Sequence, residues 1–442
     1  MKFVKKAVVT VVTAGMLAAC GGAGERDSPA KSGSLPTAEK SPPLSVKAPK
    51  GFDTSKGWQQ TVRWPDDGDT KPPVGTAPEA GIVAFLQKKG EHYVVEAREA
   101  DTGALRWSSR PWQPPALGKD VASDPRYLPQ LLVVNDNGRE YVVVWAYAAS
   151  FTEDDTVSLV LYPADSSGKE ISPAHTFSVP MNAQGDPLVA DGGNGVMVRW
   201  EDSRPGDVRT AAIDLTKDRV TVYDDEMELP CDDDIPCLGS VEALSPNGPV
   251  VQLGAHGGFG APGAWHAGDA VPPGAKTNPG KYNSGRIMEV LGGHVLSTWF
   301  PESGPGNLSV TAAHDLKSGR LVASVPCKGG EETAPARALS PDGRYAVWDT
   351  VALDFQQGKA YCFDGDSEDE FVHLVSVADG TAYGYTRPGG KTVSVAVTLD
   401  TGQVETLPAG TEIPSLLLPK AGGFTLELPD GGGQQFIFHP RR

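Results

Sequence analysis

The cysteines are the residues best suited to specific chemistry in this sequence. Four of the five are Cys231, Cys237, Cys327 and Cys362. An even number in an exported chain indicates two disulfides, and three pairings are possible. We favour Cys231–Cys237, which closes a small loop, and Cys327–Cys362, which would join neighbouring strands within one repeat unit or between adjacent units. No CxxC motif and no histidine at ligand spacing accompany them, so the support for metal binding is weak.

The fifth cysteine, Cys20, ends an N-terminal segment that has the pattern of a secretory signal. Residues 1–6 are basic, and residues 7–19 are apolar but too short to span a bilayer. Leu17-Ala18-Ala19-Cys20 resembles the lipobox of bacterial lipoproteins. The resemblance implies cleavage before Cys20, a diacylglycerol thioether on its sulfur and an acylated amino terminus, which together anchor a protein stably. The alternative is an ordinary cleaved signal that leaves Cys20 free.

Other candidate chemistry is sparse. The eight histidines show no HxH, HxxxH or HExxH spacing, and no G-x-S-x-G nucleophile motif is present. The acidic stretch 364–370 begins like a calcium loop, but Asp369 and Val375 stand where such a loop needs Gly and Glu. We therefore assign no catalytic residue and no cofactor, and leave metal binding open. The net charge of −17 repels phosphate backbones, which argues against nucleic acid as a partner.

Two tryptophans and two histidines are the best candidates for exposed ligand contacts. Trp112 and Trp265 lie in loops rich in Pro and Gly, and His256 and His266 share the loop-like segment 254–280. An ordinary polar loop is the simpler interpretation of that segment. These four residues stay candidates because nothing in the repeat pattern described next accounts for them.

The elements that must position these side chains are repeated turns and strands. Ala243-Leu244-Ser245-Pro246-Asn247-Gly248 is a near copy of residues 338–343, where Pro and Gly force a chain reversal. Strands ending in Trp recur at Trp145, Trp200, Trp299 and Trp348. A second repeated feature is a predicted hairpin turn that contains Asp followed by Gly, and it is clearest in residues 101–107. The 52 glycines and 38 prolines, about a fifth of the chain, also favour short strands over long helices.

These repeats resemble known families over roughly residues 58–440. Residues 101–107 are similar to the repeat of quinoprotein-like β-propellers, and residues 339–347 to WD40-like propeller repeats. The resemblance implies an all-β propeller of four-stranded blades, with eight favoured and seven as the alternative. We expect residues 60–64 to pair with the last strand, 435–438, and so to close the ring.

The predicted organisation is a signal peptide at 1–19, a lipid-anchored disordered linker at 20–57 and the propeller at 58–442. We expect a monomeric, non-catalytic binding or scaffold module outside the cytoplasm, anchored to the bacterial cell membrane through Cys20, with a protein partner. One alternative is a carbohydrate-active or quinone-dependent propeller enzyme, and another is a sensor domain for a membrane partner. Convergent carboxylates, Arg or His with shifted pKa values around a central channel would favour the enzyme.

Overall fold

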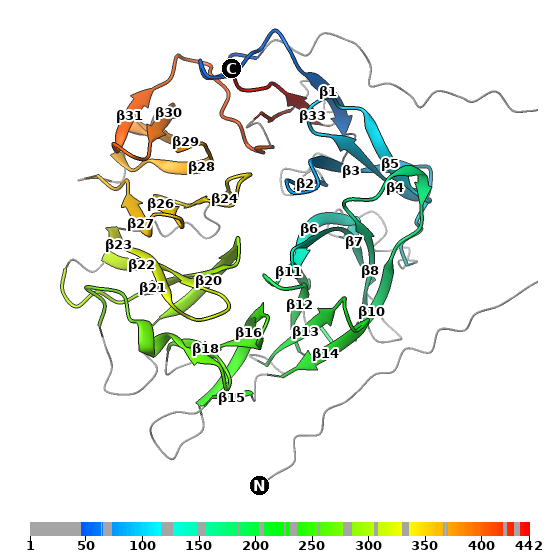
Figure 1. The fold of residues 1–442 in the computed structure, drawn as a ribbon, viewed down its shortest axis with the longest axis horizontal. Helices are drawn as coiled ribbons and strands as arrows, with labels where there is room; N and C mark the ends of the chain where they lie inside the picture. The colour runs from blue at the N-terminus through cyan, green and yellow to red at the C-terminus, as the bar shows by residue number, and fades with distance from the viewer. Residues whose placement is uncertain are drawn as a thin grey trace, which may run out of the picture.

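The structure is a computed structural model of the chain. It describes residues 46–62, 64, 73–115, 127–148, 155–183, 185–202, 207–224, 227–229, 237–253, 257–276, 285–304, 308–328, 336–365, 367, 370–418, 422–427 and 434–442. Within these residues the fold is all-β, and the strands form eight mostly antiparallel sheets that follow one another around a ring (Figure 1). The predicted fold class, a β-propeller, is confirmed.

The first four sheets take in the chain's first half and its last two strands. One sheet combines both ends of the domain: β1 (Trp58–Val62), β33 (Gln434–Phe438) and β32 (Phe424–Glu427). The next contains β2 (Val74–Ala77), β3 (Ile82–Lys89), β4 (His92–Glu99), β5 (Leu105–Ser109) and β9 (Gly168–Ile171). The third contains β6 (Gln130–Asp136), β7 (Arg139–Ala148), β8 (Asp155–Pro163) and β10 (His175–Met181). The fourth contains β11 (Leu188–Asp191), β12 (Val196–Glu201), β13 (Val208–Asp214) and β14 (Arg219–Tyr223).

The other four sheets continue around the ring in chain order. The fifth contains β15 (Met227–Leu229), β16 (Cys237–Ser245), β17 (Gly248–Leu253), β18 (Phe259–Ala261) and β19 (Trp265–His266), followed by the 3-10 turn η2 (Ala267–Ala270). The sixth contains β20 (Arg286–Leu291), β21 (His294–Trp299), β22 (Leu308–Asp315) and β23 (Leu321–Lys328). The seventh contains β24 (Arg337–Leu339), β25 (Tyr345–Trp348), β26 (Val351–Asp354) and β27 (Lys359–Cys362). The eighth contains β28 (His373–Ala378), β29 (Thr381–Thr386), β30 (Val393–Thr398) and β31 (Gln403–Thr406), with the 3-10 turn η4 (Pro388–Gly390).

The core consists of apolar seams between neighbouring sheets. Eight clusters of buried side chains each join one sheet to the next, so every sheet packs on two others. Period-two burial on β10 shows the origin of such a face, because Phe177, Val179 and Met181 are buried and the residues between them are exposed. A single hairpin sheet cannot cover both faces with apolar partners, and stacking around a ring supplies them.

The sheet β1–β33–β32 closes the ring from both ends of the domain. Gln60 pairs with Phe436 and Val62 with Gln434, as the sequence predicted for the terminal segments. The Trp58 ring packs edge-on against Phe85 of the next sheet at 6.2 Å, and its Nε1 donates to a backbone carbonyl of that sheet. Closure therefore combines backbone pairing within the sheet with aromatic packing across its seam.

Packing also reaches further toward the N-terminus than the predicted start of the domain at residue 58. Val46 and Phe52 are buried in the seam with the eighth sheet, where the Phe52 ring lies between Tyr383 and Phe424 at 6.0 and 5.1 Å. Residues 46–57 are thus packed in part on the ring. In the part of the chain that the structure describes, no helix has the length and apolar character needed to cross a membrane.

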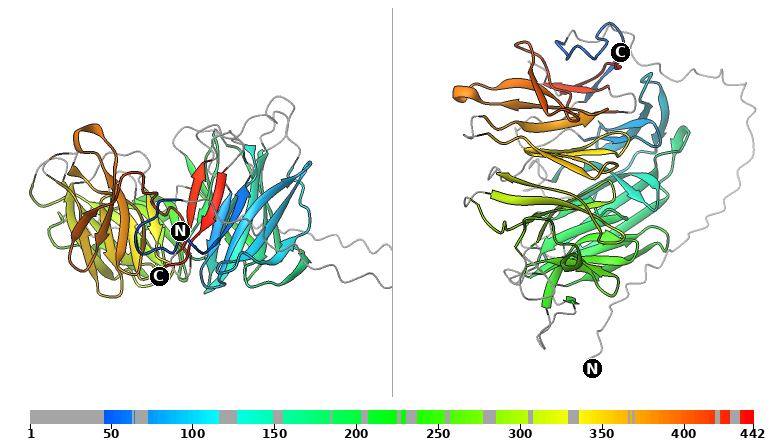
Figure 2. Two further views of the ribbon diagram at one scale, coloured as in Figure 1. Left: turned by 90° about the horizontal axis from the view of Figure 1, so that it is seen from above. Right: turned by 60° about the vertical axis from the view of Figure 1, so that its left-hand side comes forward.

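The ring has two different faces, and the strands run between them (Figure 2). In a sheet of four antiparallel strands, the turns from first to second and from third to fourth strand lie at the same end. We call the face formed by these turns the turn face. Several of its hairpins are tight, and Gly103, Gly319 and Gly402 take the positive φ that their Asp-containing turns require.

Candidate functional site

A cleft of about 450 Å³ opens on the turn face beside the sheet β11–β14. Its lining comes from the turns of three consecutive sheets: Asp136, Asn137, Asn194, Ala212, Ile213, Asp214, Thr216, Lys217, Arg219, Thr221, Tyr223, Leu244, Ser245, Pro246, Asn247, Gly248 and Pro249. The volume lies in the range of small-molecule sites, and polar side chains supply most of the wall.

The β6–β7 turn places one acidic residue at the cleft. Asn137 and Gly138 both have positive φ, at 53° and 82°, which is the backbone of a tight two-residue hairpin turn. The side-chain oxygen of Asn135 accepts the backbone N–H of Gly138 at 2.8 Å and stabilises the reversal. Asp136 ends β6 just before this turn, and its position is therefore fixed by backbone geometry.

The β13–β14 turn supplies charged groups from the middle sheet. Asp214 accepts the backbone N–H of Lys217 at 2.9 Å and the Lys217 ammonium at 2.8 Å. Burial raises the pKa of Asp214, but these bonds and the charges of Lys217 and Arg219 outweigh it, so that the pKa lies below its ordinary value. Asp214 is therefore an ionised carboxylate with its own cationic partner.

The β16–β17 turn is the Ser245–Gly248 copy of the repeated turn. The Ser245 hydroxyl donates to the carbonyl of Gly248 at 2.9 Å and accepts the backbone N–H of Asn247 at 3.2 Å. The Asn247 side-chain amide donates to the carbonyl of Lys317 at 2.7 Å, which ties this turn to the sixth sheet. These three bonds hold this wall of the cleft in place.

Asp136 differs from the other charged groups of the cleft because it is almost enclosed, with 8% of its surface exposed. Its one hydrogen bond within the described residues comes from the side-chain amide of Asn137, at 3.1 Å. Burial raises the pKa of the Asp136 carboxyl, the charge of Asp214 raises it further, and His175 opposes both. Asp136 is thus a desolvated carboxyl that has few donors and borders a cleft.

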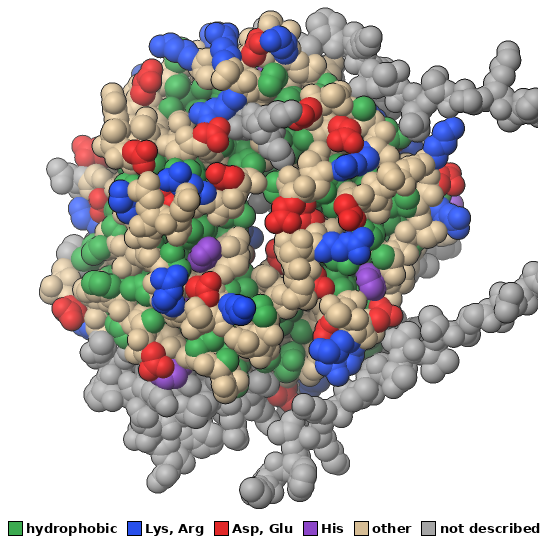
Figure 3. All heavy atoms as spheres, viewed as in Figure 1, with side chains coloured by type: hydrophobic (Ala, Val, Ile, Leu, Met, Phe, Trp, Pro, Cys, Tyr) green, Lys and Arg blue, Asp and Glu red, His purple; other side chains and the backbone are tan. Residues whose placement is uncertain are grey.

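A second set of charged groups lies on the strands nearest the central opening, where Figure 1 places β11, β16, β20 and β24. Glu242 on β16 forms an ion pair with Arg199 on β12, and Glu289 on β20 forms one with Arg337 on β24 at 2.9 Å. Burial raises the pKa of both glutamates, and the paired arginines oppose it. Figure 3 shows acidic side chains beside the opening. Each pair joins two neighbouring sheets.

Asp191 on β11 has the largest shift among these inner carboxylates. Burial raises the pKa of Asp191 to about 6, against opposing bonds from the N–H groups of Gly193 and Asn135, and Glu289 adds a small repulsion. The Gly193 bond is 2.8 Å long. Carboxylates with raised pKa values, the feature that would favour the enzyme alternative, therefore do occur on the inner strands. Because these bonds and the two ion pairs satisfy all three within the fold, we interpret them as links of the ring.

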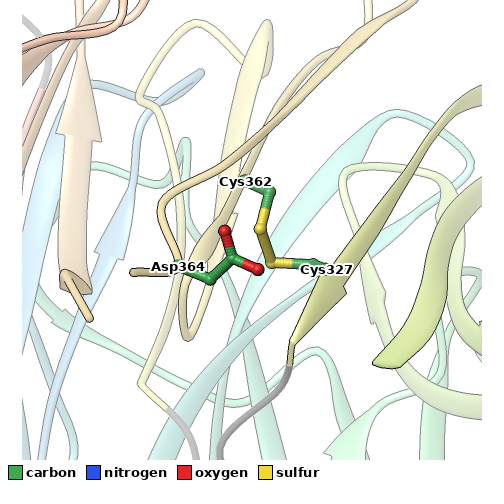
Figure 4. Close-up of side chains that lie close together, drawn as sticks. All are labelled: Cys327, Cys362 and Asp364. Carbon is green, nitrogen blue, oxygen red and sulfur yellow. A yellow bond between two sulfur atoms is a disulfide. The ribbon is translucent and has the colours of Figure 1, made fainter. Parts of the chain in front are cut away.

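The disulfide Cys327–Cys362 is present, as the sequence predicted, and joins β23 to β27 of the adjacent sheet (Figure 4). Asp364 lies beside it and accepts the backbone N–H of Lys328 at 3.1 Å. Although these three side chains are close enough to surround an ion, sulfurs bonded to each other are not thiolates and cannot act as such ligands. Cys231 and Cys20 lie outside the described residues, as does the side chain of Cys237.

The candidate contact residues do not gather at the cleft. Trp112 is half-buried and exchanges two backbone hydrogen bonds of 2.8 Å with Tyr93. Trp265 is half-buried against Phe259, and its Nε1 has no partner within the described residues. His266 forms an ion pair with Asp269 at 2.8 Å. A ligand contact by these residues stays a prediction, and His256 lies outside the described part of the chain.

The four repeated tryptophans do not all occupy equivalent places: Trp200, Trp299 and Trp348 pack against the preceding sheet, as the repeat predicted, whereas Trp145 packs against the following one. Trp145, Trp200, Trp299 and Trp348 all lie on the second strand of their sheets and pack in seams. Trp200 and Trp299 are buried, and the other two are partly so. These side chains build the ring and leave the cleft to the turns.

Sequence reasoning missed the cleft residues. The turn at 135–138 carries a recognisable Asn-Gly signal, and the Ser245–Gly248 copy was identified as a turn. Neither pattern shows that the two turns face each other across the β13–β14 turn. That convergence depends on the angle between sheets, which the sequence pattern does not contain.

Comparisons with known proteins give no family. No family model matches the chain, and no curated protein does. Solved structures that are similar include an uncharacterized protein of Listeria monocytogenes (11% identity, TM-score 0.34, covering 85% of this chain and 88% of that one). Others are AztD of Citrobacter koseri (14%, 0.34, 78% and 92%) and Hsv2 of Kluyveromyces lactis (10%, 0.30, 84% and 99%). At these values the likeness carries no functional argument.

Proposed function

We propose that this protein is an extracytoplasmic lipoprotein whose propeller is a non-catalytic binding module for a protein partner. In this account a lipid on Cys20 holds the module at the cell membrane, and residues before the packed domain act as the spacer. The cleft on the turn face receives part of the partner.

The observation that carries the binding role is the cleft itself. Turns from three sheets converge on one hollow of about 450 Å³, and hydrogen bonds hold two of those turns in defined positions. A rigid, polar hollow of this kind fits a few atoms of an inserted loop or side chain better than it fits a flat contact. The surrounding turn face offers further area for a protein.

Two features support the location outside the cytoplasm. The lipobox-like Leu17-Ala18-Ala19-Cys20 follows a basic and then apolar segment. The disulfide Cys327–Cys362 joins two sheets, and such bonds persist chiefly in oxidising compartments. Both point to an exported chain, and the first also supplies the anchor.

Photo-cross-linking in intact cells tests the proposal. A photoreactive amino acid replaces Thr216, which is exposed on the cleft wall, and products are identified by mass spectrometry. Thr401, exposed in the equivalent turn of the eighth sheet, is the matched control. We expect a discrete protein adduct from position 216 and none from position 401. Equal adducts at both positions, or none at either, would contradict the role of the cleft.

The anchor has its own test in the same cells. The substitution Cys20→Ala should move the protein from the membrane pellet to the soluble extracytoplasmic fraction, because it removes the sulfur that carries the lipid. A variant that still sediments with membranes would contradict lipid anchoring but would not affect the cross-linking result.

A further inference from the structure

We propose that the cleft binds a cationic group, an ammonium or guanidinium, through a charge-assisted hydrogen bond to Asp136. This inference rests on the proposed binding function and specifies the chemistry of what enters the cleft. The cationic group could belong to a Lys or Arg side chain of a protein partner or to a free amine.

The first argument is the environment of Asp136. The residue borders the cleft, has only 8% of its surface exposed and receives one hydrogen bond within the described residues, from the amide of Asn137. A carboxylate that loses most of its water and gains only one donor raises the free energy of the fold. The ligand can remove this cost by supplying the missing donor.

The second argument is that three nearby basic side chains contact other carboxylates, and that Arg219, which also lines the cleft, acts on Asp214. Arg139, next to the same turn, binds Asp165 at 3.1 Å. His175 contacts Asp218, also at 3.1 Å. The remaining close ammonium, that of Lys217, binds Asp214 at 2.8 Å.

The charges that act on Asp136 itself are those of Asp214 and His175. Lys217 and Arg219 act on Asp214 instead. The charge of Asp214 therefore adds to the negative charge at Asp136, which favours a cation over an anion.

The cleft walls also suit a ligand that carries hydrogen-bond donors at the end of a short aliphatic chain. Asn137, Asn194 and Asn247 contribute side-chain amides, and Tyr223 contributes a half-buried ring. Amide oxygens can accept from the remaining N–H groups of an ammonium or guanidinium, and the ring can cover the aliphatic part. A lysine side chain or a small diamine fits a volume of about 450 Å³.

Binding should weaken as the pH falls. Burial and Asp214 raise the pKa of Asp136, so protonation removes its charge at a higher pH than for an exposed aspartate.

Calorimetric titration of the full-length lipidated protein in detergent tests the inference. The probes are a blocked Gly-Lys-Gly peptide, cadaverine, and a blocked Gly-norleucine-Gly peptide that lacks the charge. We expect the first or second to bind and the third not to. The Asp136→Asn variant should bind the cationic probe at least about tenfold more weakly, which is the loss of one charge-assisted bond.

The control variant is Asp400→Asn. Asp400 is exposed in the β30–β31 turn of the eighth sheet and is not among the residues that line the cleft. It should leave the affinity unchanged. Should Asp136→Asn fail to fold, the affinity of the wild-type protein at pH 7 and pH 5 replaces it, and a decrease at pH 5 is expected.

The outcomes distinguish a protein side chain from a free amine as the source of the cation. They also test this inference separately from the proposed binding function. Tighter binding of the lysine peptide supports a protein side chain, and tighter binding of cadaverine supports a free amine as the source of the cation. Absence of binding by both cationic probes, or equal affinity in Asp136→Asn, would overturn the inference. A partner that still cross-links at position 216 in Asp136→Asn would likewise overturn it, while the proposed binding function would stand.

Discussion

Two buried aspartates on the turn face differ in the number of hydrogen bonds that they accept. Asp354 ends β26, has no exposed surface, and accepts hydrogen bonds from Arg344 at 2.7 Å and from the backbone N–H groups of Gln356 and Gln357 at 3.0 Å. Asp136 ends β6, is buried to nearly the same degree, and accepts one bond, from Asn137. The two positions differ in the donors around them far more than in burial.

The pKa values follow this difference. Burial raises the pKa of Asp354, but the bonds from Arg344 and the backbone outweigh it and leave the pKa below its ordinary value. At Asp136 burial prevails, and the pKa is raised. A fully bonded carboxylate stabilises its turn, whereas a desolvated and underbonded one is held ready for a partner. We infer that the seam of Asp354 is structural and that the region of Asp136 is the binding region.

The disulfide belongs to the structural side of this comparison and should give the largest effect. The bond between Cys327 and Cys362 closes a loop over a sequence separation of 35 residues. The loop-entropy relation predicts that Cys327→Ser with Cys362→Ser lowers the free energy of unfolding by about 3–4 kcal/mol. Denaturant unfolding measures this free energy. The wild-type protein in reductant should show the same loss of unfolding free energy. An unchanged midpoint would contradict a structural role for this seam.

A pH series on Asp191, one of the carboxylates that link the ring, extends the comparison to the inner strands. Its folded pKa of about 6 exceeds the ordinary value of 3.8, so the folded state holds the proton more tightly than the unfolded state. This contribution to stability is complete below about pH 4 and is lost as the pH rises through about 6. Asp191→Asn should therefore become more stable than wild type as the pH rises, by roughly 3 kcal/mol at pH 7.

Thermal melts of Asp191→Asn and of the wild type between pH 4 and pH 7 measure this difference in stability. Other titrating groups contribute equally to both proteins, so their contributions cancel. Asp224→Asn, at an exposed position that follows β14, is the control and should give a flat difference. A difference between Asp191→Asn and wild type that does not change with pH would show that Asp191 has an ordinary pKa in the fold.

Much of the ring could be predicted from the sequence because local turn chemistry repeats. The tryptophans of the second strands, the disulfide Cys327–Cys362 and the pairing of both ends of the domain all follow from spacing and residue type.

The cleft could not be predicted in the same way. Asp136 has the same residue type and turn context as acids that only cap hairpins. Its role depends on which basic side chains already have partners, and Asp165, Asp214 and Asp218 pair with Arg139, Lys217 and His175. Those pairings come from two different sheets, so no local pattern records them.

The most direct test of the account compares the unfolding free energies of Asp136→Asn and Asp354→Asn at pH 7. Asp354→Asn should lose about 2 kcal/mol, because it leaves Arg344 and the turn without their charged acceptor. Asp136→Asn should lose nothing and gain up to about 1 kcal/mol, because an amide is cheaper to bury there than an underbonded carboxylate. A loss at Asp136→Asn equal to that at Asp354→Asn would contradict the claim that the Asp136 carboxylate serves binding rather than the fold.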